Sequence, residues 1–507
     1  MNTFYPTPML LSILSRFQAI TKIFTVFTAF GFFTLIISCS PDAPDGEHSI
    51  IFTNINIIDA ENGLRTGQSV VVSGNKITGA GPADEIDVPS GATVIDGEGK
   101  YMIPGLWDAH VHITNTEDLR PAMFPLFIVN GITYVRDTSA TLDVILAMRE
   151  RAREAGQANG MAPEVFISGP HIESEQISWA SSISAVSPEH AASIVDSLIS
   201  ADIDEIKLYE LLPRDIYLEV LSIANEKGYN VSAHVPLSMD VIEASEAGLA
   251  SMEHMQNLEL SCSSDWENLL ESRIEMIADG AEKSGNEMRG SVHRAQRLHA
   301  IQTFDEERCE TVIRTLAANN TWQVPTLTIT TVPHHRLFAS DDWRDTFRYL
   351  PETVREDWHQ RAISMTDQEA SEEDMAYARW AYDIIPQLAE AGVGIMAGTD
   401  MPLALLTPGF SLHQELIMLE NSGLSPMQVL EAATLRPARY FGLEDQQGTI
   451  NEGKLADLVI LDANPLEDIS NTQQIHAVVR NGYLHTREDL DRFLGQLEEY
   501  GEVTTEN

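Results

Sequence analysis

Cysteine and basic residues are both scarce in this sequence. Three cysteines among 507 residues exclude a small scaffold held together by many disulfides. The sequence has only 32 lysine and arginine residues but 76 aspartate and glutamate residues, which gives a formal net charge of −44. Because a field of that sign repels phosphate backbones and anionic lipid, we expect no nucleic-acid partner. The hydrophobic content of 43% is nevertheless that of an ordinary packed protein.

Acidic residues are absent from residues 1–39, where Arg16 and Lys22 are the only charges. An apolar run follows them, too short for a committed membrane span of about 20 residues. This pattern predicts a secretory signal, and its last residues, Ile36-Ile37-Ser38-Cys39, resemble the lipobox of bacterial lipoproteins. The resemblance implies an exported bacterial lipoprotein, periplasmic or associated with the outer membrane, that is lipidated on Cys39 and touches the membrane through this lipid only. The alternatives are an ordinary cleaved signal and an uncleaved anchor.

The two ends of the remaining chain share a strand-and-turn pattern. After a tether at 40–49 that contains proline, aspartate and glycine, the segment 50–103 alternates short apolar stretches with glycine-containing turns, as antiparallel strands do. The segment 445–485 has the same character, and neither segment alone offers enough strands to bury a core. We therefore expect both to form one small β-sandwich, followed by an acidic C-terminal tail at 486–507.

Short apolar strands alternate with helical segments over 104–444. Each strand is a nearly continuous apolar run, as in a parallel sheet that is buried on both faces. Eight strand-and-helix repeats predict an α/β fold, a (β/α)8 TIM barrel, with its site at the carboxyl ends of the strands. The eight predicted strands are 106–112, 131–137, 164–170, 204–210, 229–236, 251–256, 322–328 and 394–400.

Two intervals between these strands are unusually long: 258–320 follows the sixth strand and 332–383 follows the seventh. The segment 258–320 is charged and helix-prone, and segments of this length over a barrel mouth are typically lids or substrate walls. Cys262 and Cys309 lie near its two ends. In an oxidising compartment these two thiols are the pair available for a disulfide that would pin the lid at its base. The alternative is two unpaired, buried thiols.

Residue types that bind metals stand at the ends of several predicted strands. The first strand ends in His110 and His112, whose spacing directs both imidazoles to the same side. The fifth and sixth strands bring His234 and His254, and the eighth ends in Asp400, a carboxylate that can serve as ligand and base. Singly, each is explained as well by a buried core histidine or an incidental polar strand end. Together they predict a metal site at the barrel mouth.

Lys207 lies inside the apolar fourth strand, where an unpaired ammonium group is costly. A buried lysine with a lowered pKa can react with CO2 to form a carbamate, and its two oxygens can each bind one cation. The alternatives are a lysine that extends to the barrel mouth or one that pairs with Glu210 or Asp204.

The ordered set of His-x-His, Lys, His, His and Asp resembles the ligand pattern of the amidohydrolase superfamily. The residues Met102-Ile103-Pro104-Gly105-Leu106-Trp107-Asp108-Ala109-His110-Val111-His112 are similar to its opening motif, and 448–466 is similar to its closing β-segment. The stretches 131–137, 411–416 and 432–438 are similar to the branch of imidazolonepropionase-like proteins and prolidase-like dipeptidases. The resemblance covers 50–484 and implies the subtype that has two metals and a carboxylated lysine.

The resemblance also implies how these residues act. Two divalent ions would be held by six ligands: His110, His112, Asp400, His234, His254 and carboxylated Lys207, which bridges both. Zinc suits imidazole and oxygen ligands, and manganese or cobalt would be accommodated. A hydroxide that bridges the two metals would attack the substrate carbonyl, while Asp400 would act as proton shuttle to the leaving amine.

Two more residues are candidates for binding substrate. Tyr209 follows Lys207 by two positions on the same side of the strand, so its hydroxyl can donate to the substrate carbonyl or to a terminal carboxylate, unless the ring merely packs at the barrel rim. Arg136 ends the second strand and can bind a substrate carboxylate, or instead pair with Asp137 or another wall residue.

These observations predict a metal-dependent hydrolase of amide bonds in small molecules, with a prolidase-like dipeptidase as the leading hypothesis. A cyclic amide, lactone or organophosphate ester hydrolase is the alternative, because the same two-metal centre attacks each of these groups. A non-catalytic lipoprotein that serves as a binding scaffold is a further alternative, against which the presence of all six ligand candidates argues. A small-molecule or dipeptide substrate is the expected partner, and a homo-oligomer is left open.

Overall fold

The computed structural model describes residues 49–503. The predicted signal, Cys39 and nearly all of the predicted tether lie outside this range. Within it, no helix combines the length and the apolar character that crossing a membrane requires.

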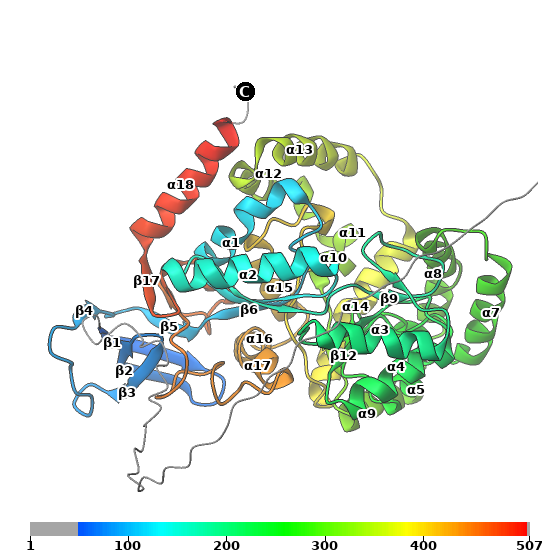
Figure 1. Ribbon diagram of the computed structural model, residues 1–507, viewed down its shortest axis with the longest axis horizontal. Coiled ribbons are helices and arrows are strands. Elements are labelled where there is room, and N and C mark those ends of the chain that lie inside the picture. The colour runs from blue at the N-terminus through cyan, green and yellow to red at the C-terminus, as the bar shows by residue number, and fades with distance from the viewer. Residues whose placement is uncertain (1–48, 504–507) are drawn as a thin grey trace, which may run out of the picture. The chain divides into compact units, whose positions relative to one another are not determined.

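Strands from both ends of the chain form one eight-stranded sheet, in the order β17-β16-β15-β5-β1-β2-β3 with β4 paired to β1. Its strands are β1 (Ile50–Asp59), β2 (Gly63–Ser73), β3 (Lys76–Pro82), β4 (Thr93–Asp96), β5 (Tyr101–Pro104), β15 (Leu458–Leu461), β16 (Ile475–Arg480) and β17 (Tyr483–Thr486). β5 pairs with β1 on one side and with β15 on the other, and so joins the two ends. Figure 1 shows these strands side by side.

The predicted β-sandwich is not confirmed, because the strands pair edge to edge in this single sheet rather than in two packed sheets. Residues from both ends nevertheless share one apolar core, in which Phe52, Ile57 and Val70 cluster with Leu458 and Val479. The predicted joining of the two chain ends in one set of strands is thus found, while a division of these strands into two packed sheets is not.

The central segment has a mixed α/β fold in which parallel strands alternate with helices. One sheet is β6-β7-β8 and the other is β10-β9-β11-β12-β13-β14. The strands are β6 (Leu106–Val111), β7 (Ile132–Asp137), β8 (Glu164–Ile167), β9 (Ile172–Glu173), β10 (Ile183–Ser184), β11 (Ile206–Leu208), β12 (Val231–Ala233), β13 (Ser251–Glu253) and β14 (Trp322–Val324). The helices between them include α1 (Arg120–Val129), α2 (Leu142–Asn159), α3 (Pro188–Ser200), α4 (Arg214–Glu226) and α5 (Val241–Glu246).

The strand pairing does not form the closed barrel that the sequence predicts. The eighth predicted strand, 394–400, is not a regular strand. Single parallel β-bridges join this part of the chain to β14, between Gln323 and Ile395, and to β6, between Val111 and Met401. The chain lies very close to β6 here, since a Cβ atom at Gly398 would sit 2.8 Å from Cβ of His110. It then turns through a left-handed conformation at Asp400, with φ 66°. This local turn ends the ladder and points Asp400 toward the first strand.

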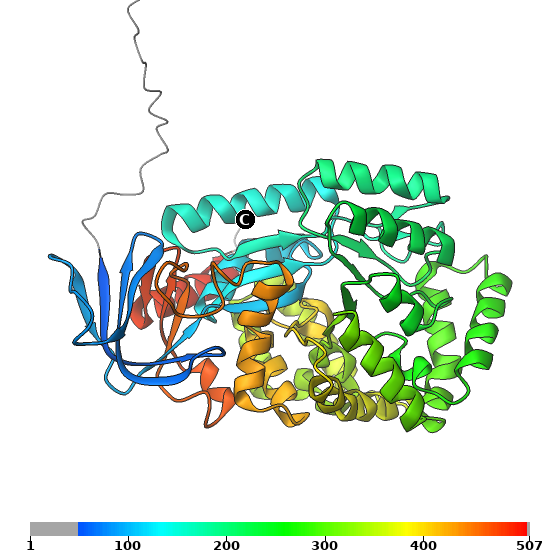
Figure 2. The same ribbon diagram turned by 90° about the horizontal axis from the view of Figure 1, so that it is seen from below.

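The long segment 258–320 is helical. It contains α6 (Leu258–Ser261), α7 (Trp266–Asp279), α8 (Gly285–Gln302) and α9 (Glu306–Ala318), and Figure 2 shows α7 and α8 (bright green) packed together. A capping box between Ser284 and Glu287 fixes the start of α8. Cys262 and Cys309 form a disulfide across the base of this segment. The alternative of two unpaired thiols is therefore wrong in this structure.

The remaining helices complete the cover of the parallel strands and the end of the chain. They are α10 (Leu327–Thr330), α11 (Val332–His335), α12 (Asp341–Asp345), α13 (Glu352–Thr366), α14 (Glu372–Glu390), α15 (Phe410–Asn421), α16 (Pro426–Ala432), α17 (Leu435–Tyr440) and α18 (Arg487–Val503). The segment predicted as an acidic tail, 486–507, is helical where α18 forms. Leu490, Phe493, Leu494 and Leu497 recur at helical spacing and pack against the core, and this apolar face stabilises the helix.

Candidate active site

A cavity of about 490 Å3 opens where the parallel strands end. His112 follows β6, Tyr209 follows β11, His234 follows β12 and His254 follows β13, and all four line this cavity. His110 and Asp400 line it as well. The structure thus brings together five of the six predicted metal ligands and the predicted tyrosine in one cavity.

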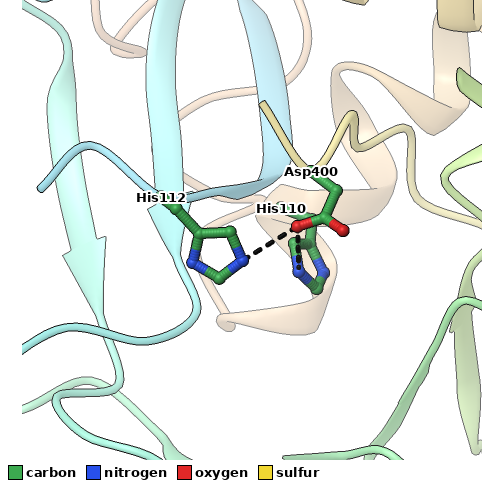
Figure 3. Close-up of side chains that lie close together, drawn as sticks. All are labelled: His110, His112 and Asp400. Atoms are coloured by element: carbon green, nitrogen blue, oxygen red, sulfur yellow. Dashed lines mark ion pairs between the residues drawn. The ribbon is translucent and has the colours of Figure 1, made fainter. Parts of the chain in front are cut away.

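The carboxylate of Asp400 faces both His110 and His112, as Figure 3 shows. Its Oδ1 is 2.8 Å from Nε2 of His112 and 3.4 Å from Nε2 of His110. Potential ligand atoms of these three buried residues all lie within 4.8 Å of one another, a spacing that would fit a metal ion. His254 approaches from the other side, with its Nε2 3.9 Å from Oδ2 of Asp400.

The Nδ1 atoms of three histidines are held by neighbouring oxygens. Glu253 accepts from His110 at 2.6 Å and Glu210 accepts from His234 at 2.8 Å. The hydroxyl of Thr326 lies 2.6 Å from Nδ1 of His254. Because a hydrogen bond at one ring nitrogen selects the tautomer, it leaves Nε2 as the free ligand atom in each ring.

Electrostatics favour a neutral imidazole at His234 and His254 and an ionised carboxylate at Asp400. At His112, burial disfavours the charged form, but the hydrogen bond and the charge of Asp400 outweigh burial and raise the pKa of this imidazole. Burial lowers the pKa of His234 to about 4 and holds the pKa of His254 well below its usual range. For Asp400, burial opposes the charged form, but His254 and His110 outweigh it and hold its pKa well below the usual range. Neutral imidazoles and carboxylates are the forms that coordinate divalent ions.

Lys207 lies in β11 beneath this cluster and is fully buried. Its Nζ has no hydrogen-bond partner, and neither predicted alternative, pairing with Glu210 or Asp204, is found in the ion pairs of residues 49–503. Burial lowers the pKa of this ammonium group to about 8. An unpartnered amine with a lowered pKa is the form that reacts with CO2, so Lys207 fits the carbamate hypothesis.

Tyr209 is positioned by two residues that the sequence analysis did not single out. Nε1 of Trp179 donates to the hydroxyl of Tyr209 at 2.9 Å, and the guanidinium of Arg289 lies 5.0 Å from the centre of the tyrosine ring. Burial raises the pKa of Tyr209, so its hydroxyl stays protonated. Since the hydroxyl oxygen already accepts from Trp179, its own proton is free to be donated into the cavity.

Arg136 does not line the cavity, and the prediction that it binds a substrate carboxylate is corrected here. Its guanidinium is fully buried, with Nη2 2.6 Å from Glu253 and Nε 3.6 Å from Glu205. The alternative of pairing with a wall residue was right in kind, although the partners are these glutamates and not Asp137. Arg136 therefore supports His110 through Glu253.

Sequence reasoning missed His171, Trp179, Arg289 and Arg297, all of which line the cavity. His171 directly follows the third predicted strand, so the signal used for the other histidines applies to it as well. Trp179 lies between β9 and β10, and the arginines lie on α8. No local pattern in the sequence places these three residues beside the strand ends.

A model of the Amidohydrolase family matches residues 101–484, and the chain belongs to this family. Over 91 residues it is 34% identical to the imidazolonepropionase of Thermoplasma acidophilum. The aligned segment covers 18% of this chain and 22% of that protein. The chain thus aligns with about a fifth of that curated relative's length.

Two solved structures share the fold over nearly the whole chain. A Xaa-Pro dipeptidase with bound methionine matches with a TM-score of 0.60 and 19% identity, over 86% of this chain and 100% of that one. Bottromycin amidohydrolase matches with a TM-score of 0.66 and 19% identity, over 89% of this chain and 90% of that one. These similarities show the mixed α/β fold of amidohydrolases.

Proposed function

We propose that this protein is a metal-dependent hydrolase that cleaves an amide bond in a small, amino-acid-derived substrate, with prolidase-like dipeptidase activity as the specific hypothesis. The observation that carries the proposal is the convergence of His110, His112 and Asp400 in one buried group. Family membership supports it, and so does the shared fold with a Xaa-Pro dipeptidase. We also infer that the two parallel sheets and residues 394–401 together correspond to the (β/α)8 barrel of this family.

The residues present fit a centre of two divalent ions. His110, His112 and Asp400 would hold one ion, and His234 and His254 would hold the other. Lys207, as a carbamate, would join them, which gives its otherwise unpartnered Nζ a role. The four imidazoles and the oxygen ligands suit zinc, and they accommodate manganese or cobalt.

When bound, such ions supply a water of lowered pKa and polarise the scissile carbonyl. Asp400, ionised and beside three histidines, takes the proton from the attacking water and delivers it to the leaving amine. Tyr209 donates its free proton to the substrate carbonyl or carboxylate. The cavity's volume of about 490 Å3 lies at the small end of the range of ligand sites and suits a dipeptide.

A dipeptide library tests this function. The purified protein, loaded with zinc, manganese or cobalt, is assayed against dipeptides that differ in their C-terminal residue, with cyclic amides, a lactone and an organophosphate ester as the other substrate classes. Hydrolysis of dipeptides, abolished by a chelator and restored by metal, is the expected result. Hydrolysis of only another class would replace the dipeptidase hypothesis, and activity that survives complete removal of metal would contradict the proposal.

We further propose that Cys39 carries a lipid and that the protein is an exported lipoprotein. The basis is the sequence alone, namely the apolar run and the lipobox-like Ile36-Ile37-Ser38-Cys39. Expression with labelled fatty acid in a Gram-negative host should label the wild type, whereas Cys39→Ser should remain unlabelled. An unlabelled wild type would contradict the proposal.

A further inference from the structure

The insertion helix α8 carries two arginines into the cavity. Arg289 and Arg297 both line it, and they lie on one face of α8 because they are about two helical turns apart. Basic residues are few in this chain, which has 32 of them against 76 acidic ones. Two guanidinium groups in one cavity therefore oppose the overall field of the protein and favour an anionic ligand there.

Arg289 is held by a short, charge-assisted hydrogen bond inside the protein. Its Nη2 donates to Glu210 at 2.5 Å, and its Nη1 donates to Asn286 at 3.4 Å. It therefore neutralises the carboxylate that holds His234, and its guanidinium also lies over Tyr209. We assign Arg289 to support of the site.

Arg297 is held in place but is weakly bonded. Its Nε lies 3.5 Å from Glu259 and its Nη2 lies 3.4 Å from His293, both long for hydrogen bonds. Glu259 is the one carboxylate that pairs with Arg297 in residues 49–503. The guanidinium carbon lies 3.9 Å from the centre of the Tyr377 ring, a contact that fixes its position. Most of the five N–H donors of Arg297 are therefore available to a ligand.

The position of Arg297 relative to the metal ligands suits a small substrate. The hydroxyl of Tyr377, whose ring lies against Arg297, donates to the carbonyl oxygen of His254 at 3.2 Å. Tyr377 thus connects Arg297 to the backbone of a candidate metal ligand. Because Arg297 and the candidate metal ligands line the same cavity, one small substrate could place its amide at the ligands and its carboxylate at Arg297.

We propose that Arg297 binds the carboxylate of the substrate, and that the insertion 258–320 thereby selects amino-acid derivatives with a free carboxylate over the corresponding neutral amides. An arginine can bind a carboxylate through two parallel hydrogen bonds, which is why it is suited to this role. Ile329, Val332 and Pro333 line the same cavity and offer an apolar surface to the substrate side chain. The inference rests on the proposed hydrolase function and names the substrate class.

Matched ligands with and without the charge test this role. The zinc-loaded wild type, Arg297→Gln, Arg297→Lys and Arg294→Gln are titrated by calorimetry with N-acetyl-L-proline and with its carboxamide. Arg294 is an exposed residue on the same helix, outside the cavity lining, and serves as the control. Leu-Pro and Leu-Pro amide are then compared as substrates.

We expect Arg297→Gln to weaken binding of the acid, and to raise KM for Leu-Pro, on the order of 10- to 100-fold, the loss expected for charge-assisted hydrogen bonds. Binding of the carboxamide and kcat should change little, Arg297→Lys should be intermediate, and Arg294→Gln should resemble the wild type. Failure of the wild type to bind the acid, or equal affinity in Arg297→Gln, would overturn the inference. Acid-selective binding that depends on Arg297 without hydrolysis of any amide would support the carboxylate site and contradict the proposed function.

Discussion

Nδ1 of His234 lies 2.8 Å from one carboxylate oxygen of Glu210, and the other oxygen lies 2.8 Å from Nε2 of His293. One buried carboxylate therefore connects a candidate metal ligand to the insertion helix α8. Burial opposes the charged form of Glu210, but Arg289 and His293 hold its pKa well below the usual range. The insertion thus contributes to the orientation of the metal site and not only to its cover.

Replacement of Glu210 by glutamine tests this connection. The amide keeps the shape but loses the charge that pairs with Arg289, and it has only one oxygen for His234 and His293. We expect affinity for zinc to fall about 10- to 100-fold, the usual effect of losing a residue that orients a ligand. The matched control is Glu219→Gln, an exposed glutamate on α4. Equal zinc affinity in Glu210→Gln and in the control would show that Glu210 does not orient His234.

Residues of the candidate metal site could be predicted from the sequence when they stand at the ends of predicted strands. His110, His112, His234, His254 and Asp400 follow from this rule, because parallel strands that share a direction deliver their last residues to one place. The rule misplaced Arg136, because it cannot tell a side chain that faces the cavity from one that pairs with glutamates in the wall.

Other parts of the site and fold depend on tertiary contacts that no local pattern encodes. Arg289 and Arg297 reach the cavity because α8 packs across the strand ends, and Trp179 does so through the loop between β9 and β10. The absence of a regular strand at 394–400 has a similar origin. The apolar run there predicts a strand, but the close approach of Gly398 to His110 and the left-handed turn at Asp400 interrupt it.

Trp179→Phe tests whether the indole orients the hydroxyl of Tyr209. The substitution keeps an aromatic ring but removes the N–H that donates at 2.9 Å. One such hydrogen bond is worth about 1 kcal/mol, so kcat/KM should fall about fivefold. In Tyr209→Phe the same substitution should have almost no further effect, and zinc content should be unchanged in all variants. Independent, additive effects of the two substitutions would contradict the positioning role.

The disulfide between Cys262 and Cys309 should stabilise the fold without contributing to the metal site. The two residues are 47 positions apart, and closing a loop of this size stabilises a protein by about 4 kcal/mol in the chain-entropy account. The double variant Cys262→Ser, Cys309→Ser should therefore unfold at lower urea concentration, with its zinc content unchanged. Mass spectrometry of the alkylated, unreduced wild type provides the check on pairing, since two modified cysteines would contradict it.

Asp400→Asn tests the proton shuttle. Asparagine keeps the shape of the side chain but is not basic, so kcat should fall by a factor on the order of 10² or more while the circular dichroism spectrum stays that of the wild type. Zinc content must be measured in parallel, because Asp400 is also a proposed ligand. Turnover near the wild-type value in a zinc-loaded Asp400→Asn protein would remove Asp400 from the chemistry.

The metal content of the purified protein tests the central proposal most directly. Elemental analysis should find two divalent ions per chain in the wild type and in Lys227→Ala, whose lysine is exposed on the surface. Lys207→Ala should lose most of this metal and its activity, and bicarbonate with a short carboxylic acid should restore part of both. A metal-free wild type that is fully active, or a Lys207→Ala protein with undiminished metal, would contradict the two-metal centre bridged by Lys207.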